Sequence, residues 1–215
     1  TTASSIDGNT GTDEAIVRAF DGFVDVYIDL QFSTYFVPSK LTAQDGMDVS
    51  LENFEKVTID GNVAATLLGT TAADTLVGDS GADTITGRAG ADTLTGGSRA
   101  DTFVFSTGDT GITEATADTI TDFSTGNDKI DIATVGSYVE ADGSGNADLA
   151  AFITDANASL PTTSIDIYAE YNFKGEGNTL VVIDEDKSGS VDAGDTLIIL
   201  TGLSTADGLA ASDFI

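Results

Sequence analysis

The sequence predicts a mainly β fold in which a stack of short repeats lies between two β-rich segments, with one helix in the C-terminal part. Three features predict it: an apolar residue at every second position of residues 24–32, a nine-residue repeat over residues 69–104, and one apolar stripe at helical spacing in residues 146–160. At 215 residues the chain is long enough for one large or two modest domains with a hydrophobic core.

The composition is strongly acidic, and it narrows the classes of function. The chain has 8 Lys+Arg against 36 Asp+Glu, a net charge of −28, which makes nucleic acid a poor partner. It has neither cysteine nor histidine, which excludes disulfides, cysteine zinc sites and catalysis by a histidine base. Its 40% hydrophobic residues argue against a disordered acidic tail, and no apolar run is long enough for insertion into a membrane.

Aspartate makes up 28 of the 36 acidic residues, and 24 residues are glycine. Aspartate favours turns and offers carboxylates from loops, so this composition indicates ligands for a hard cation, with calcium the first candidate. Such a cation would also offset the self-repulsion of the folded polyanion. The alternative is a solvated acidic surface of halophilic type, and composition alone leaves both open.

Residues 1–62 are predicted to form an N-terminal β segment. Apolar residues alternate with polar ones from Val24 to Phe32, and residues 56–59 predict a second strand. The chain starts without methionine and without a basic-then-apolar signal. We therefore expect a piece of a longer protein, with this segment as the tail of an upstream domain.

Four nine-residue units follow one another over residues 69–104. Each begins with glycine, has aspartate at its sixth position and has a large apolar residue at its eighth. The aspartates are Asp74, Asp83, Asp92 and Asp101, and the apolar residues are Leu76, Ile85, Leu94 and Phe103. Because a three-residue strand cannot bury its apolar side chain alone, the units are expected to stack on one another.

These units resemble the nonapeptide G-G-x-G-x-D-x-U-x of the RTX (repeats-in-toxin) family, whose repeats bind calcium and form a parallel β-roll. The resemblance implies such a roll over residues 63–111, with successive turns on opposite edges and turns two units apart stacked on the same edge. It also implies that the turn glycines adopt positive φ, and that carboxylates and turn carbonyls face one another across a calcium ion.

The resemblance further implies two calcium sites, each made by turns two units apart. The first would have the carboxylates of Asp74 and Asp92 and the carbonyls of Thr70, Ala72, Gly87 and Ala89. The second would have the carboxylates of Asp83 and Asp101 and the carbonyls of Asp79, Gly81, Gly96 and Ser98. Ala72 and Arg99 replace the fourth-position glycine of their units, which predicts a weakened outer turn. The alternative is that these aspartates only cap turns.

Residues 112–215 are predicted to form a C-terminal β-rich cap. Within it, residues 118–123 and 128–132 resemble the segment that closes the roll in serralysin-type and related RTX proteins. Asp109 and Asp118 are candidates for a further calcium site, or else loop acids that face water.

One helix is expected near residues 146–160, behind an Asn146 cap, with its apolar stripe packed in the core. A strand with alternating apolar residues follows over residues 165–173.

The loop between two apolar strands, residues 179–183 and 196–200, matches the twelve-residue EF-hand calcium loop in spacing. The candidate ligands are Asp184, Asp186, Ser188, the carbonyl of Ser190, Asp192 and Asp195, with Gly189 at the sharp turn. Asp195 stands where glutamate is usual, and the strand flanks argue against helix opening of the sensor type. The alternative is a polar hairpin loop.

Residues 209–215 resemble the uncleaved C-terminal signal of type I secretion substrates. A second interpretation is that Phe214 and Ile215 pack at the edge of the last sheet, and the two are compatible.

These features favour a calcium-binding RTX module of a secreted or cell-surface protein from a Gram-negative bacterium, either an S-layer protein or an adhesin. We expect about three to six calcium ions, export through the type I secretion machinery, folding outside the cell, and self-assembly into a lattice. The alternative is the C-terminal tail of a secreted hydrolase, a serralysin-type protease or a lipase. Neither H-E-x-x-H nor G-x-S-x-G occurs in the chain, and its aspartates follow calcium spacing, so no enzymatic activity is expected within these residues.

Overall fold

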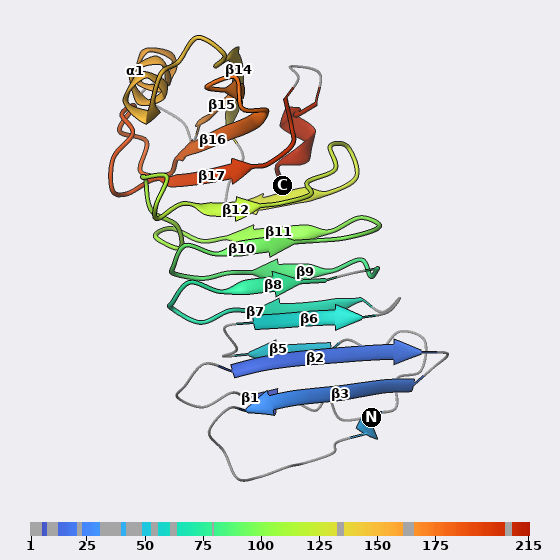
Figure 1. Ribbon diagram of the computed structural model, residues 1–215. Coiled ribbons are helices and arrows are strands. Elements are labelled where there is room, and N and C mark those ends of the chain that lie inside the picture. The colour runs from blue at the N-terminus through green and yellow to red at the C-terminus, as the bar shows by residue number, and fades with distance from the viewer. Residues whose placement is uncertain are drawn as a thin grey trace.

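The computed structural model describes residues 64–78, 80–132, 136–160, 166–204 and 208–215, and the strands that lie within residues 6–60. The chain rises from the N-terminus in stacked rungs of β-structure and ends in a cap that carries the helix (Figure 1). Within these described ranges, no helix is long and apolar enough to cross a membrane.

The strands that the structure describes form two sheets. The first has the strand order β1-β5-β7-β9-β11-β13, with the bounds β1 Ile6–Asp7, β5 Val49–Glu52, β7 Ala65–Leu68, β9 Thr84–Thr86, β11 Thr102–Phe105 and β13 Lys129–Ile132. The second has the order β14-β15-β16-β17-β12-β10-β8-β6-β2-β3-β4. Its bounds are β2 Asp13–Phe20, β3 Phe23–Leu30, β4 Lys40–Leu41, β6 Lys56–Asp60, β8 Thr75–Val77, β10 Thr93–Thr95, β12 Asp118–Ile120, β14 Ser137–Asp142, β15 Asp166–Phe173, β16 Asn178–Asp184 and β17 Thr196–Leu200.

Consecutive strands from β5 to β13 alternate between the two sheets, and their neighbours within each sheet are parallel. Leu76 of β8 is paired with Leu94 of β10, and Ile85 of β9 with Phe103 of β11, so strands two repeats apart lie side by side. This arrangement confirms the predicted parallel β-roll. Both sheets continue without interruption across the boundaries predicted at residues 62 and 111.

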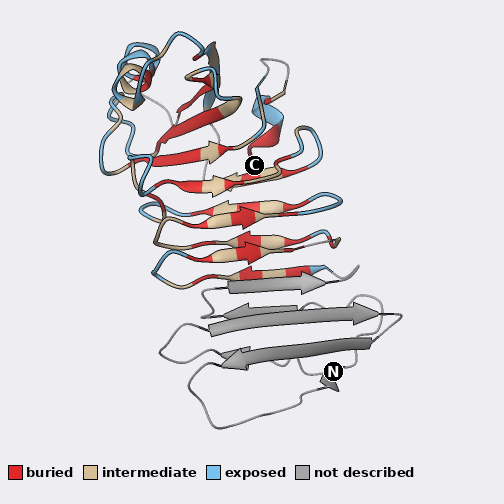
Figure 2. Cartoon of the chain, in the orientation of Figure 1, coloured by how far each residue is buried: buried red, intermediate tan, exposed pale blue. Residues whose placement is uncertain are grey.

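The interior of the roll is a single column of apolar side chains. The eighth-position residue of every repeat is fully buried, and the column continues into the strands above the repeats (Figure 2). Its members at 0% exposure include Leu76, Ile85, Leu94, Phe103, Ile120 and Ile130. Each such burial contributes about 2 kcal/mol relative to an exposed side chain, which explains why a repeat with one large apolar residue is stable only in a stack.

The two strands predicted in the N-terminal segment are present. The alternating segment forms β3, which ends at Leu30, and the second expected strand is β6. Phe32, at the end of the predicted alternation, lies outside the described residues.

The helix α1 spans Leu149–Ser159 and begins behind Asp148, whose carboxylate accepts the N–H of Ala151 at 3.0 Å. The predicted Asn146 cap is therefore wrong: its amide donates to Glu170 Oε2 at 2.7 Å. The apolar stripe does pack in a core, because Phe152 and the neighbouring apolar residues of the helix lie against β15, β16 and β17.

The strand β15 does not alternate as predicted. Its residues from Asp166 to Glu170 are buried on both faces, since one face packs on the roll core and the other lies under α1. Ile165, which the alternation included, lies outside the described residues.

The C-terminal residues extend the first sheet. A short 3₁₀ helix at Ala211–Asp213 leads into Phe214, which is 3% exposed and forms a parallel bridge with Ile130 of β13. The two main-chain bonds of Ile215 with β13 are both 3.0 Å long. These contacts support the interpretation that Phe214 packs at the edge of the sheet.

Candidate calcium sites

The turns of the roll stack along two edges, and the repeat aspartates form a row of hydrogen bonds on each. On the first edge, Asp92 Oδ1 accepts the N–H of Asp74 at 2.8 Å, and Asp118 Oδ1 accepts the N–H of Asp92 at 2.9 Å. Each aspartate therefore holds the turn below it by a charge-assisted hydrogen bond, of the kind that is stronger than a neutral one.

The second edge repeats this pattern with the other aspartates. Asp83 Oδ1 accepts the N–H of Ala65 at 2.7 Å, Asp101 Oδ1 accepts that of Asp83 at 2.8 Å, and Asp128 Oδ1 accepts that of Asp101 at 3.0 Å. The predicted alternation of turns between opposite edges is thus what the hydrogen bonds show.

The second carboxylate oxygen of these side chains is where a cation fits. Asp92, Asp101 and Asp118 are at most 1% exposed, and the Oδ2 atom of each has no hydrogen-bond partner in the described part of the chain. A buried carboxylate oxygen without a partner is costly. Oxygen-liganded cations such as calcium, bound separately on the two edges, would satisfy these atoms.

Burial and mutual repulsion raise the pKa of these carboxyls. Burial is the largest cause in each case, and it takes the pKa of Asp118 to about 8, of Asp92 to about 7 and of Asp101 to about 6. The charge of Asp109 adds to the rise in pKa at Asp92 and Asp118, and the Oδ2 atom of Asp109 accepts the N–H of Ser106 at 2.8 Å.

The opening glycines of the repeats are required by close approach of these carboxylates. A Cβ on Gly87 would lie 2.2 Å from Asp92 Oδ2, and one on Gly96 would lie 2.4 Å from Asp101 Oδ2. Neither of these opening glycines has a positive φ, so the positive φ expected of the turn glycines does not apply to them.

Positive φ occurs later in the turns. Gly90 and Gly97 adopt it, as do Arg88 at 69° and Arg99 at 87°. The two arginines therefore stand at positions that favour glycine.

Several predicted carbonyl ligands lie beside the predicted carboxylates. The carbonyl oxygen of Gly87 and Asp74 Oδ2 both approach Gly69, at 2.4 and 2.6 Å from where its Cβ would stand. On the second edge, the carbonyl of Gly96 and Asp83 Oδ2 meet at Gly78 in the same way, at 2.8 and 2.3 Å.

Of the other predicted carbonyls, that of Ala72 also lies beside a predicted carboxylate, because it and Asp92 Oδ1 lie 2.5 and 3.0 Å from where a Cβ of Gly90 would stand. The N–H of Thr70 donates to Asp74 Oδ2 at 2.5 Å. Ala89 lies in the first-edge turns, and Gly81 and Ser98 lie in those of the second edge. Asp79 lies outside the described residues.

Sequence reasoning assigned no role to Asp122 and Asp128, which continue the second edge above the repeats. Asp128 accepts the N–H of Asp101, and both oxygens of Asp122 accept N–H groups of the turn that precedes it on this edge. One signal could have found Asp128: the triplet Asp128-Lys129-Ile130 has the repeat's order of aspartate, any residue and apolar residue.

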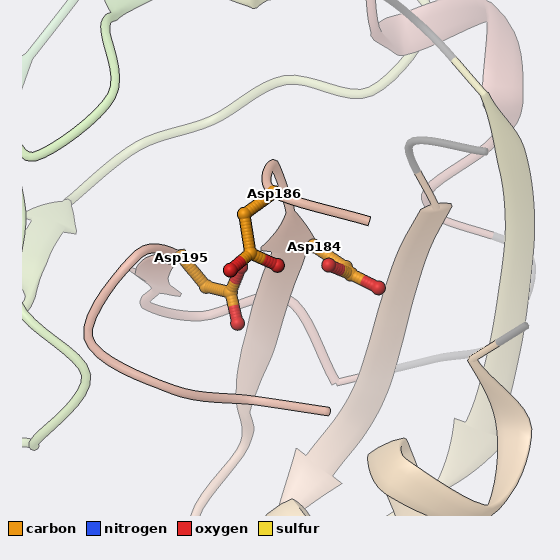
Figure 3. Close-up of side chains that lie close together, drawn as sticks. All are labelled: Asp184, Asp186 and Asp195. Atoms are coloured by element: carbon orange, nitrogen blue, oxygen red, sulfur yellow. The ribbon is translucent and has the colours of Figure 1, made fainter. Parts of the chain in front are cut away.

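The second candidate site is the loop between the antiparallel strands β16 and β17. Oxygens of Asp184, Asp186 and Asp195 lie within 4.8 Å of one another, and Figure 3 shows the three side chains close together. Asp184 and Asp195 are at most 1% exposed, and burial raises the pKa of Asp195 to about 6 and that of Asp184 as well. The arrangement suits a divalent cation with oxygen ligands.

The remaining predicted residues of this loop shape it. Gly189 has a φ of 73°, as the sharp turn was expected to need, and its N–H donates to Asp184 Oδ2 at 2.8 Å. The hydroxyl of Ser188 donates to the carbonyl of Ser190 at 2.9 Å. The carboxylate of Asp192 accepts the N–H of Gly194 at 2.9 Å and stands apart from the three clustered acids.

The stacked turns and their carboxylate rows define a cation-binding parallel β-roll. Residues 68–103 match the family model of the RTX calcium-binding nonapeptide repeat, in four copies, so this segment consists of RTX repeats and the ion that it binds is calcium. No curated protein matches the chain. Among solved structures, the chain is similar to the solution structure of a subunit of the Azotobacter vinelandii mannuronan C5-epimerase, at 22% identity over 70% of this chain and 80% of that one, with a TM-score of 0.25.

Proposed function

We propose that this chain is a calcium-dependent folding module of a secreted bacterial protein. The observation that carries the proposal is the set of buried Oδ2 atoms of Asp92, Asp101 and Asp118, which lack a hydrogen-bond partner among the described residues. At the low calcium level inside a cell, a chain with a net charge of −28 stays expanded. Calcium outside the cell neutralises the stacked carboxylates, and its binding free energy becomes folding free energy.

Two kinds of site contribute to this switch. In the roll, calcium is held between turns on one edge by carboxylates such as Asp74 and Asp92 together with turn carbonyls. In the cap, calcium binds the cluster around Asp184. That second ion also orders the helix, because Val191 of the loop donates its N–H to Asn157 of α1 at 2.6 Å.

The test is a calcium titration of EGTA-treated protein followed by far-UV circular dichroism, repeated with magnesium. We expect a cooperative gain of β-structure with calcium alone. Asp92→Asn and Asp184→Asn should each raise the calcium midpoint by about tenfold, which is about 1.4 kcal/mol. A matched control is Glu176→Gln, an exposed charge in the β15–β16 turn.

The same variants give a second, opposite readout. Without calcium, Asp92→Asn removes a charge that folding would have to bury, so it should raise the fraction of the protein that is folded. An equally folded and equally stable wild type in EGTA and in calcium would overturn the switch.

We infer further that the parent is an S-layer protein or an adhesin of the cell surface, exported through the type I machinery by means of residues 209–215. A chain without histidine or cysteine, rich in exposed carboxylates, suits calcium-bridged assembly. Electron microscopy with calcium should show ordered two-dimensional sheets that dissolve in EGTA. Monodisperse particles in calcium would favour the alternative, the tail of a secreted serralysin-type protease or lipase.

A further inference from the structure

A buried carboxyl lies where the helix α1 and the loop before it meet β15. Glu170 of β15 is 1% exposed, and its Oε1 accepts the hydroxyl of Tyr168 at 2.7 Å. Its Oε2 accepts the side-chain amide of Asn146, in the loop before α1, at 2.7 Å. A Cβ on Gly143 of the same loop would stand 2.8 Å from this oxygen. Glu170 is therefore enclosed between its own strand and the loop, with no room for added atoms.

A second carboxyl shares the amide of Asn146. Asp155 is an exposed residue of α1, and its Oδ2 accepts the same amide at 3.2 Å. Asp155 also forms a side-chain hydrogen bond with Glu170. Because an ionised carboxylate can only accept hydrogen bonds, two carboxyls can bond to each other only when one of them carries a proton. The contact between α1 and β15 at this point therefore needs one proton.

The neighbouring strands bring no charge to this pair. The residues opposite Glu170 are apolar, Ala141 on β14 and Leu180 on β16. Lys174, four residues along the chain, pairs with Glu114 at 2.7 Å. Within the described ranges, neither carboxyl of the pair forms an ion pair with a basic side chain. The negative charge of the pair is therefore offset only by a proton.

The surroundings favour the protonated form of Glu170. Burial is the largest cause that raises its pKa, and the charge of Asp155 raises it further, whereas the hydrogen bonds from Tyr168 and Asn146 lower it. A folded pKa above the ordinary value of 4.5 means that the stability from this proton is complete below about pH 4.5. That stability is lost as the pH rises through the folded pKa.

We propose that Glu170 and Asp155 share one proton and form a pH-sensitive latch, which holds α1 and the loop before it against β15. As the pH rises, the proton passes to solvent, the two carboxylates repel each other, and α1 loosens from the sheet. The change reaches the loop between β16 and β17, because Asn157 of α1 accepts the N–H of Val191 at 2.6 Å. The latch is independent of the proposed function, since neither carboxyl belongs to a candidate calcium site.

The test is amide exchange of Val191 in saturating calcium, between about pH 5.5 and 8.5. The exchange is expressed as a protection factor, so that the pH dependence of the exchange chemistry cancels. Protection should fall about tenfold over this range in the wild type. In Glu170→Gln, which has the shape of the protonated carboxyl, it should stay high at every pH. Asp148→Asn is the matched control, because it removes the same charge at the start of α1 and asparagine caps a helix as well as aspartate does. The control should keep the pH dependence of the wild type.

Titration of the Glu170 carboxyl carbon by nuclear magnetic resonance gives a second measurement. Its midpoint should lie above 4.5 in the wild type and should fall by about one pH unit in Asp155→Asn, which removes the repelling charge. Asp155 is exposed, so this variant also serves if Glu170→Gln does not fold. The latch would be refuted by a Glu170 that titrates at or below 4.5, or by equal pH dependence of Val191 protection in Glu170→Gln and the wild type.

Discussion

The side-chain hydroxyl of Thr110 accepts the N–H of Asp118 at 3.0 Å. The earlier aspartates of the first edge instead donate their N–H groups to a carboxylate. The same hydroxyl donates to the carbonyl of Leu197 in β17 at 2.8 Å. Thr110 therefore ends the carboxylate row of the first edge and joins the roll to the strand that follows the calcium-type loop of the cap.

Replacing Thr110 by valine should destabilise the calcium-bound protein. Valine has the shape of threonine but leaves the N–H of Asp118 and the carbonyl of Leu197 without their partner, which costs about 1–3 kcal/mol for each buried group. Chemical denaturation in calcium measures the loss. Thr119→Val on β12 is the control, and equal stability of the two variants would argue against this role for Thr110.

Replacing Gly87 by alanine should disturb the first edge. The new Cβ would stand 2.2 Å from Asp92 Oδ2, so the carboxylate must move, at a cost of about 1–3 kcal/mol for an overpacked site. The calcium midpoint should rise with the loss of stability. Gly145→Ala is the control, because nothing lies within 4 Å of its Cβ position and its φ is not positive. Similar midpoints for both variants would contradict the close approach.

The repeat could be predicted from the sequence because its period fixes the geometry. Strands eighteen residues apart pair in register, so Asp74 and Asp92 must share an edge once the units stack. The loop of the cap could also be predicted, because the residues from Asp184 to Asp195 lie within one short segment of the sequence. Both predictions therefore rest on local spacing, a repeat in the roll and a single loop in the cap.

What could not be predicted depends on contacts between distant segments. Asp101 and Asp128 are 27 residues apart, so an insertion breaks the period and hides the turn above the repeats on the second edge. The role of Gly87 depends on where a carboxylate lies, and the two-sided burial of β15 depends on the helix that covers it. The choice of Asp148 over Asn146 as cap depends on which side chain Glu170 engages.

Replacing Arg99 by glycine should stabilise the protein. Arg99 has a φ of 87°, a backbone conformation that costs a residue with a side chain roughly 1–2 kcal/mol. Glycine avoids this strain but loses more backbone entropy on folding, so the net gain in stability should be about 0.5–1 kcal/mol. Arg88→Gly relieves a similar strain but loses the hydrogen bond from Arg88 Nη1 to the carbonyl of Gly69 at 3.0 Å. Thermal melts in calcium should therefore rank Arg99→Gly above Arg88→Gly, and the reverse order would refute the argument.

Stability without calcium should fall as the pH rises. The pKa of Asp118, Asp92 and Asp101 is raised from 3.8 to about 8, 7 and 6 in the folded state, so the folded protein binds more protons than the unfolded chain over this range. The stability that these protonated carboxyls give the folded state is present in full below a pH of about 4, and it is lost as the pH rises through 6 to 8. The folded fraction in EGTA, followed by far-UV circular dichroism, should therefore be highest near pH 5 and decrease toward pH 8.5, and Asp118→Asn should make it depend less on pH. Calcium should reverse the trend because protons compete with it for the same oxygens. A folded fraction in EGTA that rises with pH would be incompatible with buried, repelling carboxylates.

Replacing Asp213 by alanine should release residues 208–215 from the roll. Asp213 is 1% exposed, pairs with Lys129 at 3.2 Å, and accepts the N–H groups of Gly126 at 2.9 Å and Ala210 at 3.1 Å. Hydrogen bonds to a charged group contribute about 1.5–3 kcal/mol, so their loss should free the segment while the roll stays folded.

The readout is exchange of the Ile132 amide, which donates to the carbonyl of Ile215 at 3.0 Å and should lose at least about tenfold of its protection. Ser212→Ala, at an exposed neighbouring position, should leave it unchanged. Full protection of Ile132 in Asp213→Ala would mean that the bridge between Phe214 and Ile130 holds the segment by itself.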